Sequence, residues 1–185
     1  FVGSLFGLDA LPITHLAAVD TTTGEILPFD PNGAAAASDL IPPVYALSAN
    51  AGALFVGAAS LAQRMAWIRR GPFSPGGRDS WSTLVMGAGY APVPHALAAT
   101  DSTVYVGGYF SGALGLNDVA LAARSHAFSV DIAAERVTVW NPGVGSAASF
   151  GTPPVAALAL SGSTVVLAGA MTSVGGQARN GLAAV

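Results

Sequence analysis

The sequence predicts an all-β fold made of a repeated unit of four antiparallel strands, and three observations carry this prediction. The 185 residues include 23 glycines and 12 prolines, which interrupt the chain every few residues and leave no room for long helices. Hydrophobic residues make up 52% of the chain and charged residues only 9%, so the strands can bury a large core. The third observation is that two kinds of segment recur along the chain with constant internal spacing.

The first recurring segment is a pair of apolar strands joined by a short turn. The pairs are residues 46–47 with 55–57, residues 96–97 with 105–107, and residues 157–158 with 166–168. The turns between them, residues 50–52, 100–102 and 161–163, contain the Gly, Asn, Asp and Ser that hairpins require. We therefore expect an antiparallel hairpin at each pair. Gly107 and Gly108 are expected to let neighbouring backbones approach closely.

The second recurring segment supplies two further strands. Residues 15–20 and 24–31 align with residues 126–131 and 135–142, and residues 182–185 repeat residues 16–19. Asp20 and Asp131 share one repeat position, where a carboxylate is expected to accept hydrogen bonds from the backbone of the turn. The aromatic residues that recur at matched positions are expected to pack between neighbouring units; they are Phe29, Trp140, Phe55 and Tyr105.

Ordered along the chain, one unit reads strand a (45–48), strand b (54–57), strand c (as in 16–20) and strand d (as in 25–29). Four antiparallel strands per repeat form the blade of a β-propeller. The sequence therefore predicts a partial β-propeller over residues 1–185 as a single segment, with about two complete and two incomplete blades and blade boundaries near residues 42, 92 and 153. Because a closed ring needs more blades, we expect an excerpt of a longer chain.

Three stretches of the sequence carry a resemblance to a known family: residues 103–108 (TVYVGG), 137–142 (VTVWNP) and 172–185 (TSVGGQARNGLAAV). They resemble the bacterial delta-sixty-type β-propeller repeats. The resemblance implies a secreted or surface-exposed bacterial module of a larger protein, with an extracellular, cell-surface or periplasmic location and no shared enzymatic activity. Residues 18–24 more distantly resemble the strand and turn of quinoprotein-type propellers. That similarity concerns folding, and no cofactor is expected.

Composition excludes several kinds of partner. The net charge is −3 and lysine is absent, which argues against a nucleic-acid ligand. Cysteine is absent, and the equivalent His15 and His126 with His95 in a different strand position do not make three convergent ligands, so no metal site is predicted. The apolar run at 155–171 is interrupted at 161–164 and gives two strands rather than the roughly 20-residue helix of a membrane span.

The second unit is the exception to the repeat, because its strands around residues 65–68 and 80–85 lose the family motif. Four of the seven arginines fall there, interleaved with tryptophan, and this composition is typical of protein interfaces and of sites that stack sugars or bind anions. The candidate binding residues are Arg64, Trp67, Arg69, Arg70, Arg78 and Trp81. The alternative is that these arginines form a solvated face. A second candidate is the loop at 112–125, with Asn117 and Asp118.

The sequence contains no catalytic motif, and no catalytic residue is assigned. We expect a non-enzymatic propeller module that binds a protein or a glycan, or that packs against further blades of its own or another chain. Two alternatives stay open. One is a structural subunit of an extracellular filament or surface layer. The other is a fragment of a propeller enzyme, either a quinoprotein-like oxidoreductase or a glycan-acting enzyme.

Overall fold

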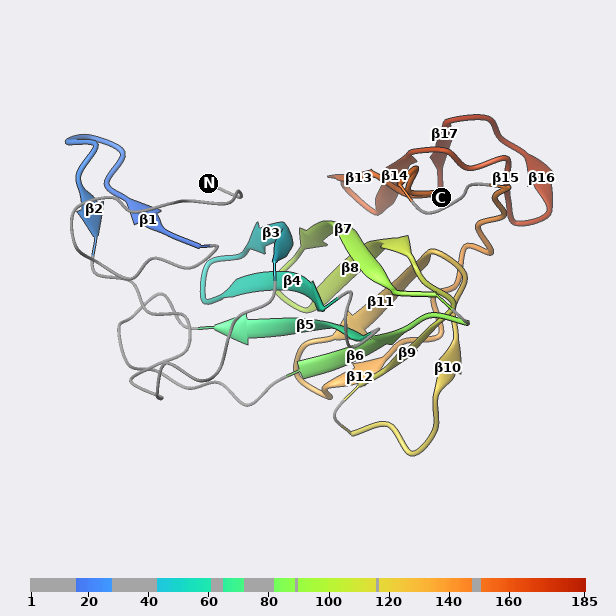
Figure 1. Ribbon diagram of the computed structural model, residues 1–185, viewed down its shortest axis with the longest axis horizontal. Coiled ribbons are helices and arrows are strands. Elements are labelled where there is room, and N and C mark those ends of the chain that lie inside the picture. The colour runs from blue at the N-terminus through green and yellow to red at the C-terminus, as the bar shows by residue number, and fades with distance from the viewer. Residues whose placement is uncertain are drawn as a thin grey trace.

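The structure is a computed structural model, and it describes residues 16–27, 43–60, 65–71, 82–88, 90–115, 117–147 and 151–185. Within these ranges the chain forms antiparallel strands and no helix (Figure 1). A helical membrane span is therefore not found among these residues. The all-β class expected from the sequence is confirmed.

Three sheets make up most of the described structure. The first sheet has the strand order β10-β9-β6-β5-β4-β3 and contains β3 (Val44–Ala49), β4 (Leu54–Ser60), β5 (Met65–Gly71), β6 (Ser82–Met86), β9 (Gly112–Leu114) and β10 (Ala122–Ala123). The second sheet has the order β12-β11-β8-β7 and contains β7 (Val93–Ala99), β8 (Thr103–Tyr109), β11 (Ala127–Asp131) and β12 (Arg136–Val137). The third sheet has the order β13-β14-β17 and contains β13 (Ala157–Ser161), β14 (Thr164–Ala168) and β17 (Leu182–Ala184).

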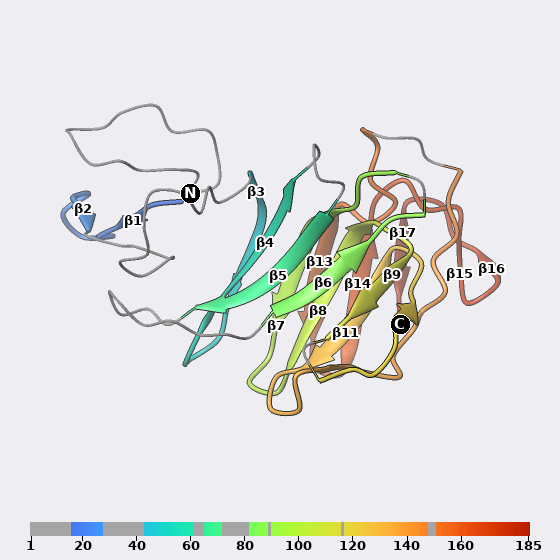
Figure 2. The ribbon, with the colours of Figure 1, turned by 60° about the horizontal axis from the view of Figure 1, so that its bottom comes forward.

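Two small hairpins accompany these sheets. One pairs β1 (Ala18–Val19) with β2 (Ile26–Leu27), and the other pairs β15 (Ser173–Val174) with β16 (Gln177–Ala178). The hairpins predicted at the three apolar pairs are present as β3–β4, β7–β8 and β13–β14. The described sheets do not close into a ring (Figure 2).

The three sheets stack face to face, with β3 beside β7 and β7 beside β13 (Figure 2). Two apolar cores fill the spaces between them. The core between the first and second sheets contains Phe55, Ile68, Val106, Phe110 and Phe128, all fully buried. The core between the second and third sheets is built around Ala127, Val144, Val155, Leu167 and Met171. Burial of apolar area between sheets is therefore the main stabilising interaction.

Glycines allow the sheets to approach at repeated positions. A Cβ added to Gly57 would lie 3.2 Å from Cγ of Pro94 at the start of β7, and a Cβ added to Gly107 would overlap the side chain of Val155. Within the second sheet, a Cβ on Gly108 would overlap the carbonyl oxygen of Val93. The close approach of backbones expected at these glycines is confirmed at Gly108, whereas Gly107 makes room for the side chain of Val155.

The tight turns of the inner hairpins are held by side-chain oxygens. Asn50 Oδ1 accepts hydrogen bonds from the N–H groups of Gly52 (3.0 Å) and Ala53 (2.9 Å). Thr100 Oγ1 accepts hydrogen bonds from Ser102 N–H (3.3 Å) and Thr103 N–H (3.0 Å). Asn and Thr therefore replace water as partners of the turn backbone, as such residues do in hairpins.

Strands β9 and β10 belong to the first sheet, although the strands before and after them in the sequence, β8 and β11, belong to the second sheet. The chain leaves β8, forms the β9–β10 hairpin, and returns to the second sheet at β11. Strand β9 pairs with β6 of the first sheet in the register Val85↔Ala113, with Leu84↔Leu114 and Met86↔Gly112 on either side. This excursion extends the outer edge of the first sheet and ties it to the second.

Candidate functional site

The six residues of the predicted arginine and tryptophan site divide into two groups. Arg64, Arg78 and Trp81 lie outside the described residues. The other three, Trp67, Arg69 and Arg70, lie in β5, and the structure describes their backbone. The register of β5 with its neighbouring strands therefore shows which of these three positions share a face of the first sheet.

Strand β5 runs between β4 and β6, so its residues have backbone partners on both sides. Trp67 is paired with Ala58 and Leu84, and Arg69 is paired with Val56 and Ser82. Because successive residues of a strand alternate between the two faces of a sheet, positions 67 and 69 share one face. The opposite face carries Ala66 and Ile68, which are fully buried against the second sheet.

Position 69 has an equivalent in each of the other two sheets, defined by the residue that pairs with it on the neighbouring strand. Arg69 pairs with Val56, Phe128 pairs with Val106, and Ala183 pairs with Leu167. In the second and third sheets this position is held by a buried apolar residue, and in the first sheet it is held by arginine. The second unit therefore departs from the repeat within strand β5, at a position on one face of the first sheet.

The second predicted feature, the loop at 112–125, is held by its own polar residues. Asp118 Oδ2 accepts hydrogen bonds from Gly115 N–H (2.7 Å) and from Val137 N–H of β12 (3.0 Å). Asn117 Nδ2 donates a hydrogen bond to the carbonyl oxygen of Ala134 (3.0 Å). Asp118 thus ties the loop to strand β12, and Asn117 ties it to the turn between β11 and β12; both roles are structural.

The repeated aspartates also hold turns. Asp20 Oδ1 accepts hydrogen bonds from Thr22 N–H and Thr23 N–H, each at 2.8 Å, and these bonds lower the pKa of the Asp20 carboxyl. Asp131 Oδ1 accepts a hydrogen bond from Ala134 N–H at 2.7 Å. The turn-capping role predicted for Asp20 and Asp131 is confirmed.

The packing between units that was expected of the matched aromatic residues is seen for Phe55 and for Trp140, which is partly buried against the core between the second and third sheets, whereas the contact of Tyr105 with Trp140 lies within one unit. The rings of Tyr105 and Trp140 meet edge to face with centroids 5.1 Å apart. Phe55 is fully buried in the core between the first and second sheets. Phe29 lies outside the described residues. The observed geometry is that of packing contacts.

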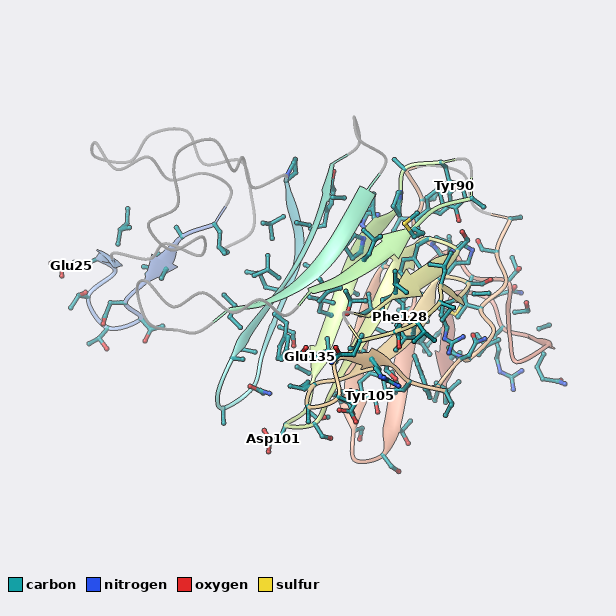
Figure 3. The ribbon with its side chains drawn as sticks, turned by 90° about the horizontal axis from the view of Figure 1, so that it is seen from below. Glu25, Tyr90, Asp101, Tyr105, Phe128 and Glu135 are labelled. Atoms are coloured by element: carbon teal, nitrogen blue, oxygen red, sulfur yellow. The ribbon has the colours of Figure 1, made fainter. Side chains whose placement is uncertain are left out.

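An aromatic cluster that sequence reasoning missed lies at one end of the second sheet. Tyr90 and Tyr109 have ring centroids 4.3 Å apart, and His126 stacks on Tyr109 with centroids 6.0 Å apart and an interplanar angle of 8°. Figure 3 shows Tyr90 at the end of this sheet opposite the turn that carries Asp101. The sequence signal was the repeated histidine at positions 15 and 126, which alone does not reveal the tyrosine neighbours.

Within this cluster His126 has two unusual properties. Its backbone is left-handed, with φ 66°, and its Nδ1 atom is buried without a hydrogen-bond partner among the described residues. Burial lowers the pKa of His126, which favours the neutral imidazole near neutral pH. A strained backbone and a buried imidazole nitrogen commonly occur at functional positions, but no cation ligand set surrounds this one in the described part of the chain.

His95 lies elsewhere, between the first two sheets. Its ring meets the ring of Tyr45 of β3 edge to face at 5.7 Å, and burial lowers the pKa of His95. His15 lies outside the described residues. In the described ranges, no three His, Cys, Asp or Glu side chains converge as metal ligands would.

Comparisons with protein-family models, with curated proteins and with solved structures find no match to this chain. The resemblance to delta-sixty-type repeats therefore stays a prediction from the sequence.

Proposed function

We propose that the chain is a sector of a β-propeller that acts as a non-enzymatic binding module of a secreted or surface-exposed bacterial protein. The observation that carries this proposal is the repeated order of strands. In the first sheet β3, β4, β5 and β6 are consecutive antiparallel neighbours, and in the second sheet β7, β8, β11 and β12 follow the same order. Four such strands per unit, with the first strands of successive units side by side, are the arrangement of propeller blades.

Repeated contacts between the sheets support the same proposal. Gly57 meets Pro94 and Gly107 meets Val155, and both partners lie two residues before an Ala-Leu pair in an inner strand. Within the second sheet, Gly108 approaches the carbonyl oxygen of Val93, the residue before Pro94. Within the third sheet, Gly169 approaches the carbonyl oxygen of Pro154, the residue before Val155. The blade boundaries predicted near residues 42, 92 and 153 each precede an inner strand. Contacts that repeat at equivalent positions favour a common blade geometry.

The proposed ligand is a protein or a glycan that contacts the first sheet at the β5 positions. Charged residues are depleted in sheet interiors, and Arg69 occupies a position that is apolar in the two equivalent sheets. Arginine beside tryptophan binds anionic groups and stacks on sugars or aromatic rings. An acidic glycan or an acidic protein surface is the ligand class with matching chemistry.

The test compares charge reversal in two sheets. The variant Arg69→Glu and the control Arg136→Glu, an exposed residue of β12, are applied to an array of neutral and acidic glycans. Arg70 is left unchanged, because the alternation of β5 puts position 70 on the same face as Ile68. We expect the parent chain and the control to bind the same acidic glycans, and Arg69→Glu to lose roughly tenfold or more in affinity. Equal binding by a folded Arg69→Glu variant, checked by circular dichroism, would refute the proposed contact.

A further inference from the structure

The chain returns to the second sheet at His126, after the excursion of β9 and β10 to the first sheet. The N–H group of His126 donates a hydrogen bond to the carbonyl oxygen of Phe110 (3.2 Å), and the carbonyl oxygen of His126 accepts one from Gly108 N–H (3.0 Å). The backbone of His126 is therefore bonded on both sides of the last residue of β8. We call residues 111–125, which lie between Phe110 and His126, the clasp.

The clasp joins the second sheet to the edge of the first sheet. At its base, Arg124 N–H donates a hydrogen bond to the carbonyl oxygen of Ser111 (2.9 Å), and Ser111 N–H donates one to the carbonyl oxygen of Met86 in β6 (2.8 Å). Between Ser111 and Arg124, strand β9 pairs with β6 (Figure 2). Without the clasp, β6 would be an edge strand with unpaired backbone groups.

The packing of the His126 ring suits a neutral imidazole. The ring stacks on Tyr109 with centroids 6.0 Å apart, and the ring of Phe110 lies 6.5 Å away at an angle of 49°. Nδ1 is buried and has no hydrogen-bond partner among the described residues. In the neutral ring this nitrogen can remain an unprotonated acceptor, whereas in the imidazolium it carries a proton and part of a positive charge. Burying a charged nitrogen without a partner costs more than burying a neutral one, so this packing opposes protonation.

The groups around the ring do not compensate a positive charge on it. They are Tyr109 of β8, Tyr90 in the connection before β7, and Arg124 two residues earlier in the chain. The guanidinium of Arg124 is itself positively charged, and its Nη2 donates a hydrogen bond to the carbonyl oxygen of Thr138 (2.7 Å). Since none of these groups is a carboxylate, burial acts without an opposing attraction and lowers the pKa of His126.

The backbone of His126 links the position of its ring to the clasp. Its φ of 66° lies in the left-handed region, which is uncommon for a residue other than glycine. The surrounding structure must therefore stabilise this conformation, and the stack on Tyr109 is part of that structure. If the ring leaves Tyr109, the backbone can return to a more common conformation, which turns its N–H and carbonyl groups away from Phe110 and Gly108. Loss of ring packing and loss of the hydrogen bonds that close the clasp are thereby coupled.

We propose that His126 is an acid-sensitive switch of the clasp. In mildly acidic solution its ring becomes protonated and leaves the stack on Tyr109, the clasp separates from β6, and the rest of the three sheets stays folded. The open clasp exposes the backbone edge of β6, the strand next to β5. The switch depends neither on the proposed ligand contact at β5 nor on whether the three sheets belong to a propeller.

The experiment measures amide hydrogen exchange of Ser111 and Arg124 at about pH 7.5 and about pH 5.5, as protection relative to the intrinsic exchange rate at each pH. An exposed histidine has a pKa of about 6.5, so the open clasp binds a proton over this interval more readily than the closed clasp. We expect the protection of both amides to fall by roughly three- to tenfold at the lower pH. Protection in β14 of the third sheet should change by less than about twofold.

The variant His126→Asn removes the titrating ring, and asparagine tolerates a left-handed backbone. We expect the protection of the clasp amides in this variant to be the same at both pH values. His95→Gln is the matched control, because His95 is also partly buried but lies against Tyr45 of β3. This control should keep the loss of protection that the parent chain shows.

Three results of this experiment would overturn the proposal. The first is unchanged protection of the clasp amides in the parent chain. The second is the same loss in His126→Asn, since another group would then be titrating. The third is an equal loss in β14, because the whole structure would then open rather than the clasp. If His126→Asn does not fold, an NMR titration of the His126 ring in the parent chain decides: a midpoint below about 6.5 supports the switch, and a midpoint at or above it overturns the proposal.

Discussion

The contact between Gly107 and Val155 offers a direct test of how the second and third sheets pack. Replacing Gly107 by alanine puts a Cβ into the space occupied by Val155, which is fully buried. Overpacking of this kind costs about 1–3 kcal/mol. Val155→Ala alone removes two methyl groups and leaves a cavity, and we expect a loss of about 2 kcal/mol.

The double variant Gly107→Ala/Val155→Ala distinguishes this contact from a general loss of stability. The new Cβ at position 107 occupies part of the space that the valine methyls vacate, so the two losses should not add. We expect a favourable coupling of about 1–2 kcal/mol, measured as the free energy of unfolding in urea. Gly52→Ala is the control, because Gly52 lies in a turn with its nearest atom 4.0 Å from an added Cβ. Additive losses in the double variant would refute the packing of Val155 on Gly107.

Three further predictions follow from the described contacts. Phe128→Ala should lower the free energy of unfolding by about 3–5 kcal/mol in urea titrations, since Phe128 is fully buried and its ring meets Phe110 edge to face at 5.2 Å. An unchanged urea midpoint would contradict this core. Asp118→Ala should cost about 1–3 kcal/mol and speed amide exchange at Val137, because two backbone donors lose their partner. Unchanged exchange at Val137 would contradict that role. The folded-state pKa of His126 lies below its ordinary value of 6.5, so stability should be full above pH 6.5 and fall as the pH drops below it. An NMR titration of His126 at or above 6.5 would contradict this.

The inner hairpins can be predicted from the sequence because every signal for them is local. Strand β3 alternates buried and partly buried residues, and the turn after it begins with Asn50, whose side chain closes the turn on its own backbone. Recurrence of the same pattern at β7 and β13 then predicts their pairing without knowledge of the tertiary structure. Asp20 and Asp131 were predictable for the same reason, since each bonds to a backbone N–H within three residues.

The excursion from β8 to β6 could not be predicted, because its partner is distant in the sequence. The strand pairing of Val85 with Ala113 depends on the stacking of two sheets, which brings the edge of the first sheet next to a loop of the second. Periodicity in residues 112–123 is too short to identify a strand, since β9 has three residues and β10 has two. The interpretation of this segment as a loop was therefore wrong in part.

The residue types of the candidate site could be predicted from the sequence, but the sheet face on which each residue lies could not. Arginine and tryptophan are visible in the sequence at 64–81, but the face on which each lies depends on the register of β5, and a one-residue shift would exchange the two faces. The cluster around His126 was missed for another reason. The left-handed backbone of His126 depends on tertiary packing, and the preference of histidine for this conformation is too weak to predict it from the sequence.

Position 69 distinguishes the first sheet from the other two sheets. Phe128 and Ala183 occupy the equivalent position where one sheet packs on the sheet before it, and both are buried. An arginine at that position would oppose the same kind of apolar packing, whereas it suits a charged or hydrated partner. The register therefore places an arginine in the first sheet where the second and third sheets have buried apolar residues. This difference favours contact with a charged or hydrated partner at this position of the first sheet, in place of the apolar packing at the equivalent positions of the other two sheets.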